Sequence, residues 1–142
     1  MGLLDKFRRK KVITYSNKLD GKRLGRSFKA AFCGIKETYE KEQNIKIHTM
    51  MAILVVVCGF IFKISYGEWL VCLVLIGFVL MAEFFNTAIE YVVDLASPNI
   101  HPLAKAAKDT ASAGVLMMAI LSAIIGLVIF VPKIIEVIGG LI

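Results

Sequence analysis

Charged residues are scarce in the larger part of this chain. Of its 142 residues, 20% are charged and 58% are hydrophobic, and residues 49–142 contain only ten charged side chains. Such a composition does not supply the polar surface of a soluble fold, so it indicates an integral membrane protein. The length fits one domain, which excludes a separate soluble catalytic domain beside the apolar part.

Cysteine motifs and nucleotide-binding loops are equally lacking. The three cysteines, Cys33, Cys58 and Cys72, have no CxxC or CxxH spacing, so neither a disulfide framework nor a zinc site is predicted. Gly21–Ser27 contains glycines and basic residues but lacks the GxxxxGK[ST] spacing of a phosphate-binding loop. Any chemistry must therefore use the membrane segments and their flanks.

Positive charge is concentrated at one end of the chain. Residues 1–29 contain ten Lys and Arg against two Asp. These basic residues precede long apolar runs and are not interleaved with base-stacking aromatics, so we expect anionic lipid headgroups, and no nucleic acid, as their partner. By the positive-inside rule the N-terminus lies in the cytoplasm. We predict that residues 1–23 form a basic cytoplasmic tail.

Three apolar stretches are long enough to cross a bilayer, which takes about 20 residues per helix. They cover about 47–64, 69–93 and 110–131, and the last is expected to end at Pro132. Ser97-Pro98 supplies turn chemistry between the second and third spans. The sequence thus predicts an all-α protein with three spans in the cell membrane, its C-terminus outside.

The segment 24–46 is predicted to form an additional helix. Apolar residues recur in it at steps of three or four, which favours a basic amphipathic helix on the inner leaflet: Leu24, Phe28, Phe32, Ile35 and Tyr39. The alternative is a helix packed on a partner domain. With the spans, it would complete a single membrane domain over residues 24–142.

Ionisable residues inside the second span are the main anomaly. Glu83, Asn86 and Glu90 share one helix face, which Asp94 extends by a turn. A charge near the bilayer centre costs at least ~2.5 kcal/mol, so this face must meet protein, water or a cation. One interpretation is a carboxylate paired with lysine during helix assembly. The other is a site for Mg²⁺, which prefers one or two carboxylates together with phosphate oxygens.

A second polar face opens the third span. Lys105, Lys108, Asp109 and Ser112 share it, and a lysine there can neutralise a phosphate. Alternatively, the lysine only snorkels at the helix start. Glu42, taken alone, is most simply a solvated surface charge.

These residues resemble a known signature. Glu83–Asp94 carries the pattern ExxNxAIExxxD and is followed by His101–Asp109, HPLAKAAKD. Together with Gly34 and Glu42-x-Asn44, this resembles the small prokaryotic diacylglycerol kinase and undecaprenol kinase family. The resemblance implies a homotrimer of three-span subunits that uses ATP and Mg²⁺ to phosphorylate a lipid alcohol, at sites near the cytoplasmic face that neighbouring subunits complete.

The resemblance also implies roles for single residues. Glu83 would be the general base for the lipid hydroxyl, and Glu42 and Glu90 would hold Mg²⁺. Asn86 would orient metal or phosphate. Lys108 would neutralise the transferring phosphate.

Further positions match the nucleotide and lipid contacts of the family. Asp109 would support the nucleotide site, and Asn99, Ile100 and His101 match a loop that contacts ATP. Ser112 matches a lipid-side contact. Two basic residues, Arg23 and Arg26, align with residues that serve nucleotide and substrate. Ala30 replaces an aromatic nucleotide contact, so the adenine-side contacts stay open.

The lipid substrate expected from the resemblance depends on two short sequence segments. Gly25–Phe28 and His101-Pro102-Leu103 look like the Gram-positive branch, which favours undecaprenol over diacylglycerol. The alternative lipid is diacylglycerol. A non-enzymatic alternative is a trimeric ion pathway with Glu83 and Glu90 as an internal relay, although it leaves Glu42 and Lys108 without a task.

Overall fold

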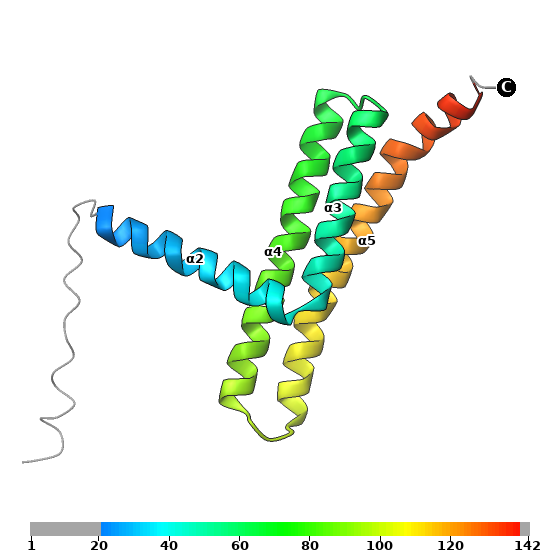
Figure 1. Ribbon diagram of the computed structural model, residues 1–142. Coiled ribbons are helices and arrows are strands. Elements are labelled where there is room, and N and C mark those ends of the chain that lie inside the picture. Colours follow the sequence, from blue (N-terminus) through cyan, green and yellow to red (C-terminus); the bar gives the residue numbers. More distant parts are fainter. Residues whose placement is uncertain (1–20, 140–142) are drawn as a thin grey trace, which may run out of the picture. The chain divides into compact units, whose positions relative to one another are not determined.

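The computed structural model describes residues 21–139, in which every regular element is a helix (Figure 1). The helices are α2 Gly21–Lys41, α3 Gln43–Ile61, α4 Tyr66–Ala96 and α5 Pro102–Gly139. The last three are long and apolar enough to cross a membrane, which confirms the predicted all-α protein with three spans. Most of the predicted basic tail lies outside the described residues. Residues 35–139 belong to one compact unit, and the packing below is theirs.

The junction of α2 and α3 differs from the prediction. The surface helix expected to reach residue 46 ends at Lys41, because Glu42 has extended backbone angles, φ −94° and ψ 131°. The Glu42 N–H still donates to the Thr38 carbonyl, at 2.8 Å. Apolar spacing continues across this position, so periodicity could not locate a break that involves one residue.

The turn between α3 and α4 is closed tightly. Ser65 caps α4: its hydroxyl accepts from the Glu68 N–H, and the Glu68 carboxylate accepts from the Ser65 N–H at 2.6 Å. Gly59 lets the Trp69 ring pack directly on α3, since a Cβ at this position would lie 2.7 Å from the ring. Behind the turn, the buried core at this end of the bundle consists of Ile64, Cys72 and Ile129.

Helix α5 does not end before Pro132 but continues through it to Gly139. Proline costs one backbone hydrogen bond, yet its fixed φ is helical, and membrane helices tolerate it. Beyond the proline, Lys133 Nζ lies 3.2 Å from Glu68 Oε1, which ties this part of α5 to the start of α4.

Helix α4 contacts both other spans and packs more extensively on α5 than on α3. It is also the most buried of the three. Large apolar side chains elsewhere remain exposed, for example Phe60 and Met117 at 72% each. This is expected where the surrounding medium is lipid rather than water.

Candidate active site

The first part of the polar face of α4 is turned inward, whereas Glu90 is half-buried and Asp94, one turn further, is exposed. Glu83 is 2% exposed, Asn86 7% and Thr87 2%. The Thr87 hydroxyl donates to the Glu83 carbonyl at 3.0 Å, and the Asn86 amide donates to Glu90 Oε1 at 3.0 Å. These bonds fix the face along two turns of the helix.

Two buried oxygens on this face lack a hydrogen-bond partner: Oε1 of Glu83 and Oδ1 of Asn86. The Nε2 atom of His48, on α3, lies 3.3 Å from Glu83 Oε1. The two groups are within ion-pair distance, but without the alignment of a full hydrogen bond. Buried polar atoms are normally satisfied, so unpaired ones mark a place where a ligand can bind.

A cavity of about 320 Å³ opens onto these atoms. Its lining contains three predicted site residues, Glu83, Asn86 and Ser112. Two residues of α3, Asn44 and His48, line it as well. Ser112 was predicted as a lipid-side contact, and it reaches the same cavity from α5. Three helices therefore supply one polar cavity.

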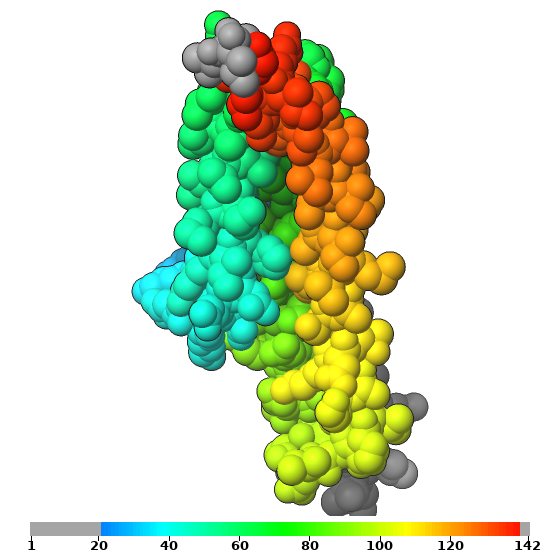
Figure 2. All heavy atoms as spheres, turned by 90° about the vertical axis from the view of Figure 1, so that its right-hand side faces the viewer, coloured from blue at the N-terminus to red at the C-terminus, as the bar shows by residue number. Residues whose placement is uncertain are grey.

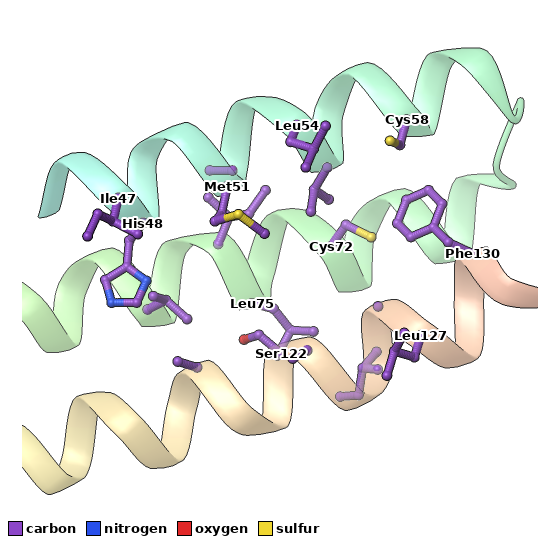
Figure 3. A pocket seen from close by; sticks show the side chains of 18 residues that line it. Ile47, His48, Met51, Leu54, Cys58, Cys72, Leu75, Ser122, Leu127 and Phe130 are labelled. Atoms are coloured by element: carbon purple, nitrogen blue, oxygen red, sulfur yellow. The ribbon is translucent and has the colours of Figure 1, made fainter. Parts of the chain in front are cut away.

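An apolar groove of about 580 Å³ runs along the spans between α3 and α5. Figure 2 shows α4 at the bottom of this groove, and Figure 3 shows His48 near one end and Phe130 at the other. The groove shares Ile47, His48 and Ala119 with the polar cavity. Because His48 borders both spaces and lies 3.3 Å from Glu83, a long apolar chain in this end of the groove would present its polar end near Glu83.

The donor set near Glu83 fits Mg²⁺. Glu42 and Glu90 both interact electrostatically with Glu83, and Asn86 Oδ1 offers a neutral oxygen. Within residues 21–139 no group of three His, Cys, Asp or Glu side chains could enclose a metal. Mg²⁺ is commonly held by one or two carboxylates with phosphate oxygens and water, so two carboxylates suffice when a nucleotide supplies the rest.

Contacts around the α2 to α3 junction hold Glu42 in place. Lys41 Nζ lies 5.1 Å from the centre of the Tyr91 ring on α4 and 2.8 Å from Glu37 Oε1. The hydrogen bond with Glu37 raises the pKa of Lys41 above its ordinary value. Tyr39 and Thr49 share a hydrogen bond across the junction. The backbone on both sides of Glu42 is therefore held by contacts of neighbouring residues.

The lysines of α5 are divided between two partners. Lys108 Nζ lies 2.7 Å from Asp94 Oδ1 on α4, whereas Lys105 pairs with Asp109 on the outside of its own helix. Asp109 was predicted to share one helix face with both lysines and to support the nucleotide site. It lies one turn after Lys105 on that face and pairs with it.

The predicted nucleotide loop joins α4 to α5 and is exposed. The Ser97 hydroxyl donates to the Asn99 carbonyl at 3.0 Å, and His101 Nδ1 accepts from the Leu103 N–H at 3.2 Å, at the start of α5. Ile100 is fully exposed. The basic residues Arg23 and Arg26 are exposed on the first part of α2, and their assignment stays a prediction.

The sequence interpretation assigned no role in the site to His48 or Asp94. His48 falls inside the predicted first span, 47–64, where an ionisable residue is a signal for function. Asp94 was recognised as part of the acidic face but was not paired with Lys108. Both contacts join different helices, which no local spacing reveals.

The fold and the cavity define a small helical membrane protein with a carboxylate site at the end of an apolar groove. Comparison with known proteins agrees with this class. A family model described as prokaryotic diacylglycerol kinase matches residues 29–130. An undecaprenol kinase of Bacillus subtilis is 47% identical over 111 residues, which is 78% of this chain and 90% of that protein.

Two diacylglycerol kinases are more distant relatives. The one from Synechocystis is 32% identical over 111 residues, 78% of this chain and 63% of that protein. The one from Helicobacter pylori is 32% identical over 95 residues, 65% of this chain and 74% of that protein. The chain belongs to the prokaryotic diacylglycerol kinase family and is a lipid kinase. The non-enzymatic ion pathway is accordingly set aside.

Proposed function

We propose that this protein uses ATP to phosphorylate undecaprenol to undecaprenyl phosphate at the cytoplasmic boundary of the bacterial cell membrane. The observation that carries the proposal is the buried carboxylate of Glu83, which lines the polar cavity next to His48, a residue that also lines the apolar groove. A membrane-borne alcohol needs both features, because its chain stays in an apolar environment while its hydroxyl must reach a base. The relative at 47% identity is named an undecaprenol kinase, which supports this substrate.

In this proposal Glu83 is the general base. It accepts the proton of the lipid hydroxyl while the hydroxyl oxygen attacks the γ-phosphorus of ATP and ADP leaves. Direct transfer of this kind requires little covalent chemistry from the protein, so positioning and charge neutralisation dominate. Within the described residues α4 contains no histidine, and its one cysteine, Cys72, lies about three helical turns from Glu83.

Glu42 and Glu90 would hold Mg²⁺, and Asn86 would orient the metal or a phosphate oxygen. When bound, Mg²⁺ supplies positive charge that neutralises the phosphate oxygens. Two contacts support this arrangement. The Asn86 amide donates a hydrogen bond to Glu90, and the contact of Lys41 with the Tyr91 ring anchors the residue before Glu42.

Lys108 would act on the transferring phosphate. Its side chain is 35% exposed and its ammonium pairs with Asp94, so it can exchange a carboxylate for a phosphate. The remaining nucleotide contacts are assigned to one loop and its flanks, with Ser112 on the lipid side: Asn99, Ile100, His101, Asp109, Arg23 and Arg26.

We further propose that three copies assemble and that α2 lies on the inner leaflet. The exposed apolar side chains of the spans support assembly. Small residues on α5 would permit close helix contacts: Ala111, Ala113, Gly114, Ala119, Ala123 and Gly126. The basic N-terminal segment supports a cytoplasmic N-terminus with the C-terminus outside, and attraction to anionic headgroups.

One competition assay tests the substrate. Detergent-solubilised protein receives labelled ATP with undecaprenol and diacylglycerol side by side, because several relatives are named diacylglycerol kinases. We expect undecaprenol to be preferred by at least about tenfold in kcat/KM. A preference for diacylglycerol would replace the proposed substrate, and Glu83→Gln at the wild-type rate would remove the proposed base.

A further inference from the structure

Glu83 is almost completely buried, yet few groups compensate its charge. Among the described groups that act on it electrostatically, Glu42 and Glu90 are also acidic, and His48 is the one that can carry positive charge. A buried carboxylate without a partner is costly. His48 Nε2, at 3.3 Å from Oε1, is therefore the contact that defines the carboxylate's surroundings.

His48 comes from α3, whereas Glu83 comes from α4, so their contact depends on how the two helices pack. The His48 side chain is 21% exposed and lines both the polar cavity and the apolar groove. It lies at the junction through which a lipid chain in the groove would deliver its hydroxyl (Figure 3). A residue at this place can influence the reaction without touching ATP.

We infer that His48 is a positioning residue that holds one oxygen of Glu83 and thereby directs the other oxygen to the lipid hydroxyl. The inference rests on the proposed role of Glu83 as base. A glutamate side chain has three rotatable bonds, and a base works only within about 2.6–3.2 Å of the proton it removes. In catalytic sites a third group commonly orients the base.

The proton balance leaves His48 unchanged. The hydroxyl proton goes to Glu83 Oε2, the new bond forms between the lipid oxygen and the γ-phosphorus, and the bond from that phosphorus to the leaving ADP oxygen breaks. His48 keeps its own hydrogens throughout. The contact at 3.3 Å tightens on substrate binding, as catalytic hydrogen bonds commonly do.

Two conservative substitutions separate this role from simple packing. His48→Gln keeps an N–H donor near the position of Nε2, which faces Glu83. His48→Asn places its donor near Nδ1 instead, and His48→Leu has none. If His48 only fills space, the Gln and Asn variants should behave alike.

The experiment measures kcat and KM for the full chain in detergent with ATP and undecaprenol. We expect His48→Leu and His48→Asn to lower kcat about 10²-fold with KM for ATP unchanged, and His48→Gln to recover to within about tenfold of wild type. Met50→Leu is the matched control, since this side chain of α3 is 63% exposed and lines neither the cavity nor the groove, and it should keep the wild-type kcat.

Glu83→Gln in the same assay separates the two hypotheses. If it is inactive while His48→Asn works at the wild-type rate, His48 has no positioning role and the base assignment survives. If Glu83→Gln is fully active, both assignments fail. Equal losses in His48→Gln and His48→Asn would also overturn the inference. Should His48→Leu fail to fold, which thermal unfolding would reveal, the Gln and Asn variants still decide.

Discussion

Lys108 on α5 reaches across to Asp94 on α4, with Nζ 2.7 Å from Oδ1. One turn earlier, Lys105 pairs with Asp109 within α5. The two lysines therefore differ in what they join: one links two helices beside the acidic face, and the other faces outward. This difference allows a matched test of which lysine serves the phosphate.

Replacing each of these lysines by methionine should separate them. We expect Lys108→Met to lower kcat about 10²-fold, because a positive group aimed at the developing phosphate charge is lost. Lys105→Met should stay within about twofold, since an exposed i, i+4 pair contributes little. Steady-state kinetics with labelled ATP measures both. Equal losses in the two variants would deny Lys108 a special role.

Removing the charge of Glu90 should weaken metal dependence. In Glu90→Gln the new side chain can still accept from Asn86, so the hydrogen bond at 3.0 Å is retained while the charge is lost. We expect the Mg²⁺ concentration for half-maximal rate to rise by about 10–100-fold. Glu40→Gln, at an exposed position paired with Lys36, is the control. An unaltered Mg²⁺ titration for Glu90→Gln would contradict the metal assignment.

Narrowing the junction between groove and cavity should affect the lipid alone. Ala119 lines both spaces, so Ala119→Phe should lower kcat/KM for the lipid at least about tenfold and leave KM for ATP unchanged. Met117→Phe, at a side chain that is 72% exposed, should leave both constants near wild type. A matching rise in KM for ATP with Ala119→Phe would show that the groove is not specific for the lipid.

Gly59 offers a test of packing that does not involve the active site. The added Cβ of Gly59→Ala would meet the Trp69 ring at 2.7 Å, and such overpacking costs about 1–3 kcal/mol. We expect a lower unfolding temperature in detergent. Gly77→Ala meets no atom within 4 Å and should be neutral or stabilising, by up to about 1 kcal/mol. If Gly59→Ala and Gly77→Ala unfold at the same temperature, the close approach of Trp69 does not constrain the turn.

Much of the fold could be predicted because hydrophobicity and turn residues are local signals. The three spans and the inward face of Glu83 and Asn86 follow from composition and helical spacing. Two boundaries could not be predicted in this way. Glu42 breaks the helix through its backbone angles within a continuous periodic pattern, and α5 continues through Pro132, whose fixed φ is compatible with a helix.

In the candidate site, too, the features within one helix could be predicted, whereas the contacts between helices could not. Spacing within one helix collected Glu83, Asn86 and Glu90, but it could not show that His48 meets Glu83 or that Asp94 meets Lys108. These contacts depend on the rotation and depth of neighbouring helices, which one sequence does not encode locally. The catalytic and metal assignments came from the family resemblance, and they stay predictions until the variants are measured.

Helix length has a last consequence for how two substrates of opposite solubility meet. From their shared turn, α3 runs back for 19 residues and α4 runs on for 31. At about 1.5 Å per residue, α4 therefore continues roughly 18 Å past the level where α3 begins. Figure 1 shows α4 and α5 extending together beyond α3. Glu83 lies near that level. The lipid alcohol can therefore stay on the side of the α3–α4 turn and the nucleotide on the side of the α4–α5 loop, so that neither has to leave its own solvent to react.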